Sequence, residues 1–145
     1  MDACIICIGN RRSKMDDFGP RVYERLAAAP LPAGIRLVDG GLAGLDLLRY
    51  LESCSRAVFV DAVDGFAGPG ELVVLSAAEV ADQCIGGYDH GAGLPYLLRV
   101  LPRVLDVPVP VVTLVGHEGS ADEQAVRIAA RLATLIAGRE DKDVR

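Results

Sequence analysis

Short apolar runs alternate along this chain with amphipathic stretches. The runs are rich in Val and Ile and end at polar or Gly residues, a pattern typical of buried strands in a parallel sheet. Between them, leucines and alanines recur at spacings of three and four, which predicts helices with one apolar face. The pattern predicts strands at 3–8, 35–38, 57–60, 71–75 and 109–115, helices at 20–29, 45–51, 94–101 and 120–137, and a short helical turn at 77–83.

The order of these elements predicts a fold class. The link 61–70 is too short for a crossover helix, so the strand 71–75 is expected to be antiparallel or to lie at an edge. The other strands alternate with helices, which predicts an α/β three-layer sandwich with a mostly parallel, five-stranded twisted sheet and helices on both faces. We expect residues 1–138 to form a single domain and the charged tail 139–145 to be frayed. Ser120 to Glu123 has the pattern of a capping box for the last helix, and Gly138 is a natural stop.

Polar residues follow the first three predicted strands. Asn10 and Asp16 follow the first, Asp39 the second and Asp61 the third. Ligands of open α/β sheets bind outside the carboxyl ends of the strands, so these side chains are expected at one rim. His90 follows in a Gly-rich stretch. Two carboxylates and an imidazole in one crevice would suit a divalent transition metal.

Composition limits the partners. The chain has 145 residues, of which 51% are hydrophobic, but no apolar run approaches the ~20 residues that span a bilayer. The first residues lack the features of a signal peptide, which predicts a cytoplasmic protein. A net charge of −5 argues against nucleic acid or an anionic membrane as the main partner.

The four cysteines do not form a disulfide framework. Cys4 and Cys7 lie three positions apart in a predicted strand, where their side chains point to opposite faces. They therefore cannot share a metal or a disulfide, and they are expected to be buried core thiols. Cys54 and Cys84 fall in predicted connections without a nearby partner. This usage is typical of a reducing compartment.

Several common catalytic and nucleotide-binding motifs are missing from the sequence. Cys7 and Arg12 stand where a dinucleotide fingerprint around Gly9 would need glycines. The sequence has no Walker motif and no Gly-x-Ser-x-Gly nucleophile turn, so a nucleotide-binding domain and a serine hydrolase both lack their key residues. His117 follows the last strand and is expected to be a surface loop residue.

Four segments, in this order, resemble the signatures of the nickel–iron hydrogenase maturation endopeptidases. They are the stretch from Ile8-Gly9-Asn10 through Asp16 to Phe18-Gly19-Pro20-Arg21-Val22, the stretch Asp39-Gly40-Gly41 with Gly44-Leu45, the run Val60-Asp61-Ala62, and Asp89-His90 with Gly93-Leu94. The resemblance extends over nearly the whole chain, and it is the shared order and spacing that carry it.

The resemblance implies an endopeptidase that removes a C-terminal extension from the hydrogenase large-subunit precursor after nickel insertion. Nickel carried by this precursor would be the recognition element. By position, the residues implied to contact nickel and to act in catalysis are Asp16, Asp61 and His90, with Asp39 as a further candidate. The metal could polarise the scissile carbonyl or only mark completed insertion, and both roles stay open. The alternative is a module of the same fold that binds nickel or the precursor without cutting.

The first loop departs from the family pattern. Asp17 stands where a glycine is usual, so it is an alternative to Asp16 as metal ligand. The spacing from Asn10 and Gly19 favours Asp16. The segment Arg11 to Lys14 gives the loop a positive charge, which is either simply solvated or involved in the choice of precursor.

Overall fold

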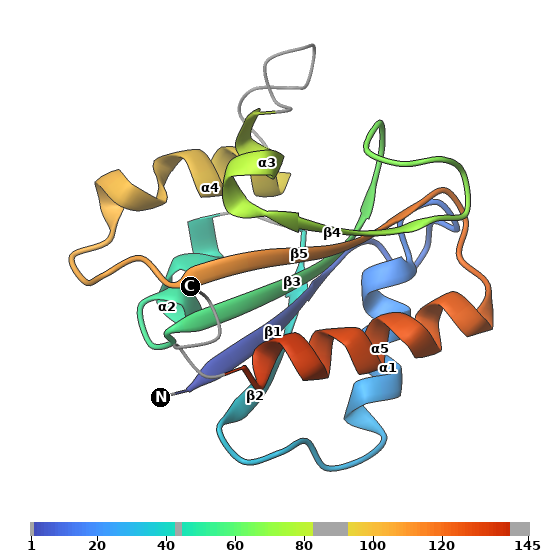
Figure 1. Cartoon of the computed structure of the whole chain (residues 1–145), viewed down its shortest axis with the longest axis horizontal. Helices are drawn as coiled ribbons and strands as arrows, with labels where there is room; N and C mark the ends of the chain where they lie inside the picture. Colours follow the sequence, from blue (N-terminus) through green and yellow to red (C-terminus); the bar gives the residue numbers. More distant parts are fainter. Residues whose placement is uncertain (1, 43–44, 83–92, 140–145) are drawn as a thin grey trace.

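A computed structural model describes the chain except for residues 1, 43–44, 83–92 and 140–145 (Figure 1). Within the described residues, five strands form one sheet in the order β2-β1-β3-β5-β4. Neighbouring strands are parallel except β4, which pairs antiparallel with β5 at the edge of the sheet. The strands are β1 (Ala3–Ile8), β2 (Ile35–Gly41), β3 (Arg56–Val63), β4 (Leu72–Ser76) and β5 (Val111–Glu118). This arrangement confirms the predicted mostly parallel sheet and the antiparallel edge strand.

Helices cover both faces of the sheet, as predicted. One face carries α1 (Phe18–Ala27) and α5 (Glu123–Ala137), which also pack against each other. The opposite face carries the 3₁₀ turn η1 (Leu45–Leu47) and the helices α2 (Leu48–Leu51), α3 (Ala77–Asp82) and α4 (Gly93–Val104). No helix in the described part of the chain is long and apolar enough to cross a bilayer.

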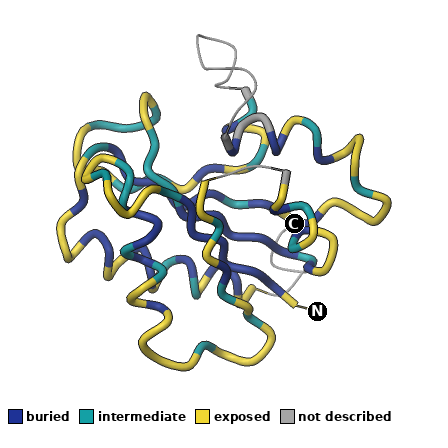
Figure 2. The backbone as a smooth tube through the Cα atoms, turned by 180° about the vertical axis from the view of Figure 1, so that it is seen from behind, coloured by how far each residue is buried: buried dark blue, intermediate teal, exposed yellow. Residues whose placement is uncertain are grey.

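The central strands are buried on both faces, which explains their continuous apolar runs (Figure 2). In β1, Ile5 and Cys7 point toward α1 and α5, whereas Cys4 and Ile6 point toward the other helical layer. The prediction that Cys4 and Cys7 lie on opposite faces is therefore confirmed.

Two glycines allow the loop after β1 to fold tightly against the strand. A Cβ on Gly19, in the first turn of α1, would overlap the backbone of Ile8. A Cβ on Gly9 would overlap the backbone carbonyl of Asp16, and the φ of Gly9 is +150°. These close approaches require glycine at both positions. They explain in physical terms why Gly9 and Gly19 flank the loop.

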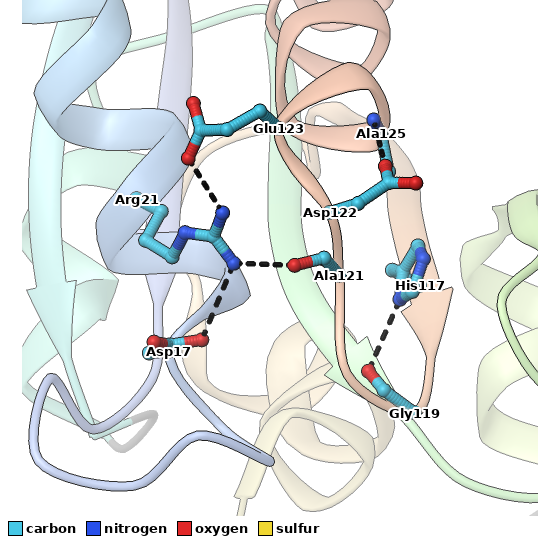
Figure 3. Close-up of polar contacts among 8 residues, drawn as sticks. All are labelled: Asp17, Arg21, His117, Gly119, Ala121, Asp122, Glu123 and Ala125. Atoms are coloured by element: carbon cyan, nitrogen blue, oxygen red, sulfur yellow. Dashed lines mark hydrogen bonds and ion pairs between the residues drawn. The ribbon is translucent and has the colours of Figure 1, made fainter.

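Some predicted details were wrong. The predicted helix 45–51 has the expected bounds, but it is a 3₁₀ turn followed by a single α-helical turn. The N-cap of α5 is Asp122 rather than Ser120: its backbone is extended and its Oδ1 accepts the N–H of Ala125 at 2.8 Å (Figure 3). Asp122 supplies the same kind of acceptor as Ser120 and lies directly before the helix. The proposed frayed tail lies outside the described residues apart from Arg139.

The prediction that Cys54 has no nearby partner was also wrong. Cys54 hydrogen-bonds Cys4, and this bond, aided by Arg36, lowers the pKa of Cys4. The Nη2 of Arg36 lies 3.4 Å from the Sγ of Cys4. The three described cysteines are free thiols, and Cys84 lies outside the described residues.

Candidate metal-binding site at the carboxyl edge of the sheet

The strand order places a switch point at the carboxyl ends of β1 and β3. From β1 the chain crosses to β2 on one side, and from β2 it returns to β3 on the other side of β1. Such a crevice is the usual ligand position in an open α/β sheet. Asp16 lies in the loop that leaves β1, and Asp61 lies within the last half of β3. The topology thus brings both predicted acids to one rim.

Asp16 is held by hydrogen bonds to the start of its own loop. The N–H of Asn10 is shared between the backbone oxygen of Asp16, at 2.9 Å, and its Oδ2, at 3.1 Å. The side-chain oxygen of Asn10 in turn accepts the N–H of Arg12 at 2.9 Å. Asp16 is only partly exposed, and burial raises the pKa of its carboxyl, although the Asn10 N–H opposes this shift. The loop therefore fixes a carboxylate that is less solvated than a surface acid.

Asp61 has the more perturbed carboxyl. Burial raises its pKa well above the ordinary value, and the neighbouring charge of Asp16 raises it further, while the N–H of Ala62 acts in the opposite direction. Both shifts follow from placing an acid in a poorly solvated site beside another acid. A pair of this kind is favourable when a cation or a proton is shared between the two groups.

The third predicted ligand, His90, lies outside the described residues. Within the residues that the structure describes, no group of three or more His, Cys, Asp or Glu side chains could hold a metal ion. The described part of the site therefore consists of the Asp16 and Asp61 carboxylates.

Asp17 has different partners from Asp16. Its Oδ1 lies 4.0 Å from the Nη1 of Arg21, one turn further along α1 (Figure 3). Arg21 also donates to the backbone oxygen of Ala121 at 2.6 Å and to Glu123 at 2.8 Å. These contacts join the beginning of α1 to the beginning of α5. Asp17 thus belongs to an ion-pair network between two helices.

Asp39 lies at the same edge of the sheet but is paired with the first loop. Its Oδ2 accepts from Nη2 of Arg11 at 2.6 Å, and its Oδ1 accepts the N–H of Gly41 at 3.2 Å. Arg11 also contacts Glu24 at 3.1 Å, and the Asp39 carboxylate raises the pKa of Arg11. Two acids therefore balance the charge of Arg11, whereas Arg12 and Lys14 are exposed.

His117 is not the surface loop residue that the sequence predicted. The strand β5 continues through Glu118, and the His117 side chain is 1% exposed. Its Nδ1 lies 3.1 Å from the carbonyl oxygen of Gly119 (Figure 3). Its ring centroid lies 5.2 Å from that of Phe18. By strand alternation His117 shares the face of Val115, toward α1 and α5. In β3, Val60 also points toward α1 and α5. Because adjacent side chains of a strand point to opposite faces, the Asp61 side chain points to the other face of the sheet.

Glu118 organises the turn after β3, a role that sequence reasoning missed. Its carboxylate accepts the N–H groups of Gly65, Phe66 and Ala67 at 3.0–3.2 Å. Burial alone would raise the pKa of Glu118, but the three N–H donors and a hydrogen bond with Asp64 bring it below the ordinary value. The Gly-rich turn after β3 was the only signal, because such turns leave N–H groups without strand partners. It could not identify Glu118 as the acceptor, since Glu118 lies more than 50 residues away in the sequence.

Comparisons with known proteins are consistent across sequence and structure. The family model described as HycI, hydrogenase maturation protease, matches residues 20–137. The chain is 42% identical over 77 residues to the hydrogenase expression/formation protein HupD of Rhodobacter capsulatus, covering 52% of this chain and 37% of that protein. It is 31% identical over 104 residues to the hydrogenase 3 maturation protease of Escherichia coli K12, covering 70% of this chain and 65% of that protein.

Solved structures give the same fold. The maturating endopeptidase HybD of Escherichia coli superposes with a TM-score of 0.71 at 25% identity, covering 93% of this chain and 88% of that chain. The protease HycI of Thermococcus kodakarensis gives a TM-score of 0.69 at 24% identity, with 94% and 90% covered.

The sequence matches cover only part of the curated relatives, and the family match covers only part of the candidate site. This chain spans about two fifths of the length of the HupD relative and less than two thirds of the Escherichia coli protease. The stretch matched by the family model includes Asp39 and Asp61 and begins after Asp16.

Proposed function

Because this chain belongs to the hydrogenase maturation protease family, we propose that it is an endopeptidase acting on a nickel–iron hydrogenase large-subunit precursor. It would remove the C-terminal extension after nickel has been inserted. The observation that carries this proposal is the pair of poorly solvated carboxylates, Asp16 and Asp61, that the strand order brings to the switch point of the sheet. A cation brought by the substrate would relieve the repulsion between them.

The residue types fit such a cation. Carboxylate oxygens, together with an imidazole, suit a borderline divalent ion such as nickel. We propose that Asp16 and Asp61 bind the nickel of the precursor, and that His90 is the third protein ligand. Ions bound in this way leave coordination positions for the precursor's own groups. The substrate's nickel could then polarise the scissile carbonyl or act as a template that positions it.

The position of α4 supports the assignment of His90. This helix begins at Gly93, three positions after His90. It packs on the face of the sheet to which the Asp61 side chain points. It runs antiparallel to β5, so it begins nearer to the carboxyl edge than it ends (Figure 1). Asp17 and Asp39 have basic partners, Arg21 and Arg11, and we therefore assign neither of them to the metal.

The test is precursor processing with and without nickel. Purified protein is incubated with a large-subunit precursor that has been loaded with nickel, and in parallel with the nickel-free precursor. We expect a decrease in size only for the nickel-loaded precursor, and no decrease with the Asp61→Asn variant. Equal cutting of both precursors would contradict nickel recognition.

The same experiment separates the enzyme from the binding module. If the nickel-loaded precursor binds the protein in a co-elution assay but keeps its size, the chain is a non-cleaving nickel- or precursor-binding module. We further propose that the reaction takes place in the cytoplasm. The free thiols of the three described cysteines, which suit a reducing compartment, support this location.

A further inference from the structure

A second polar site lies at the opposite edge of the sheet from Asp16 and Asp61. A pocket of about 420 Å³ is formed there by the first residues of three parallel strands, the loop before β2 and the end of α5. The floor of the pocket is formed by three residues that lie side by side in the sheet. Ala3 of β1 pairs with Ile35 of β2 on one side and with Arg56 of β3 on the other. The wall of the pocket is the segment Ala137 to Arg139.

Arg56 is the unusual residue in this pocket. It is 3% exposed, and its Nε and Nη2 have no hydrogen-bond partner among the described residues. Strand alternation places its side chain on the face of Val58 and Val60, under the end of α5. A guanidinium stays charged at physiological pH, and a buried charge without a partner is strongly unfavourable. The structure therefore places a desolvated guanidinium in the lining of the pocket, with two buried nitrogens that no described residue satisfies.

The lining of the pocket is suited to an anion. Arg139 is a second basic residue in the lining, and no Asp or Glu lines the pocket within the part of the chain that the structure describes. Two of the last carbonyls of α5 are already engaged, because Thr134 and Ile136 accept the N–H groups of Gly138 and Arg139. Small residues at Ala3, Gly34 and Gly138 leave the space open.

We propose that this pocket binds a small oxyanion, a carboxylate or a phosphate, through the guanidinium of Arg56, with Arg139 as second donor. The N–H groups of a guanidinium form a planar fork that matches two oxygens of one carboxylate or phosphate group. This site is separate from the proposed nickel site and does not depend on the proposed peptidase activity.

The test titrates the full chain with inorganic phosphate and, separately, with acetate, at constant ionic strength adjusted with sodium chloride. We expect saturable binding of one anion per chain by calorimetry, and a melting temperature that rises with the concentration of the anion that binds. Comparing the two probes distinguishes a phosphate site from a carboxylate site.

Variants connect the binding to the two arginines. Arg56→Met should lower the affinity at least about tenfold, because the main charged donors are lost. Arg139→Gln should lower it less, and Arg103→Gln, an exposed arginine on α4, should leave it unchanged. In the absence of the anion, Arg56→Met should be as stable as the native chain or more stable, and less stable than the native chain once the anion is saturating.

The proposal is overturned if neither anion binds saturably. It is also overturned if Arg139→Gln binds as tightly as the native chain. The Arg139 variant changes an exposed residue, so it keeps the test decisive even if Arg56→Met does not fold.

Discussion

The Asp16 carboxylate raises the pKa of Asp61, although the two residues come from a loop and a strand far apart in the sequence. Each acid is also desolvated by the surrounding chain. Two charged carboxylates in such a position oppose folding unless a cation lies between them. The pair is therefore expected to destabilise the free protein, and the metal proposed to bind there would relieve this cost.

A first prediction follows for Asp61. Its folded-state pKa lies above the unfolded value, so ionisation destabilises the native state. The penalty is absent below the unfolded pKa, grows as the pH rises toward the folded pKa, and is complete above it. Asp61→Asn should therefore raise the melting temperature at neutral pH, and the gain should disappear on acidification.

Thermal melts across a pH series, recorded without metal, measure this effect. Asp106→Asn is the matched control, because Asp106 is exposed and its substitution should change the melting temperature little at any pH. A lower melting temperature for Asp61→Asn at neutral pH would show that the Asp61 carboxylate stabilises the free fold.

The second prediction separates two adjacent acids. Asp16→Asn should abolish processing, because the substitution removes a charge from the proposed metal contact. Asp17→Asn should leave most of the activity, since Asp17 faces Arg21 rather than Asp61. Neither variant should unfold, and loss of the partly exposed Asp17–Arg21 pair should cost at most about 1 kcal/mol.

Precursor processing by both variants, with thermal melts as the folding control, shows which of the two acids is the ligand. If Asp17→Asn is inactive and Asp16→Asn cuts normally, Asp17 is the ligand and the alignment of the loop is shifted by one residue.

A third prediction concerns the turn held by Glu118. Three backbone N–H groups and Asp64 lower the pKa of Glu118, so the ionised group stabilises the fold above its unfolded pKa. This contribution should be lost as the pH falls through the lower, folded pKa. Glu118→Gln should lower the melting temperature at neutral pH and become nearly equal to the native chain in acid.

The exposed Glu52→Gln serves as the control in the same pH series. An unchanged melting temperature for Glu118→Gln at neutral pH would mean that the turn at 65–67 does not need the charge.

Much of the fold could be predicted because local pattern and topology agree. Branched apolar runs identified every strand of the described sheet, and the short link before β4 indicated its antiparallel direction. The resemblance to hydrogenase maturation proteases is confirmed by the family match. Both features depend on patterns that are continuous along the chain.

The errors occurred where the outcome depends on contacts between distant segments. Cys54 meets Cys4 only because β1 and the connection before β3 lie side by side in the fold. His117 is buried because α1 brings Phe18 against the end of β5. Ser120 and Asp122 are both good N-caps, and only the path of the chain selects Asp122.

The last prediction tests the backbone contact that shapes the first loop. Gly19→Ala should lower the free energy of unfolding by more than about 2 kcal/mol, because the new Cβ would overlap the Ile8 backbone, which cannot move without disturbing β1. The matched control is Gly138→Ala at the end of α5. There φ is −81° and the nearest atom to a new Cβ is 3.4 Å away, so the change should stay within about 1 kcal/mol. Denaturant unfolding of both variants measures the difference. Because Asp16 lies only three residues before Gly19, a shift of α1 away from β1 should also move Asp16, so Gly19→Ala should lose processing activity under conditions where it is still folded. Similar stability of the two variants would mean that α1 can move away from β1 at little cost.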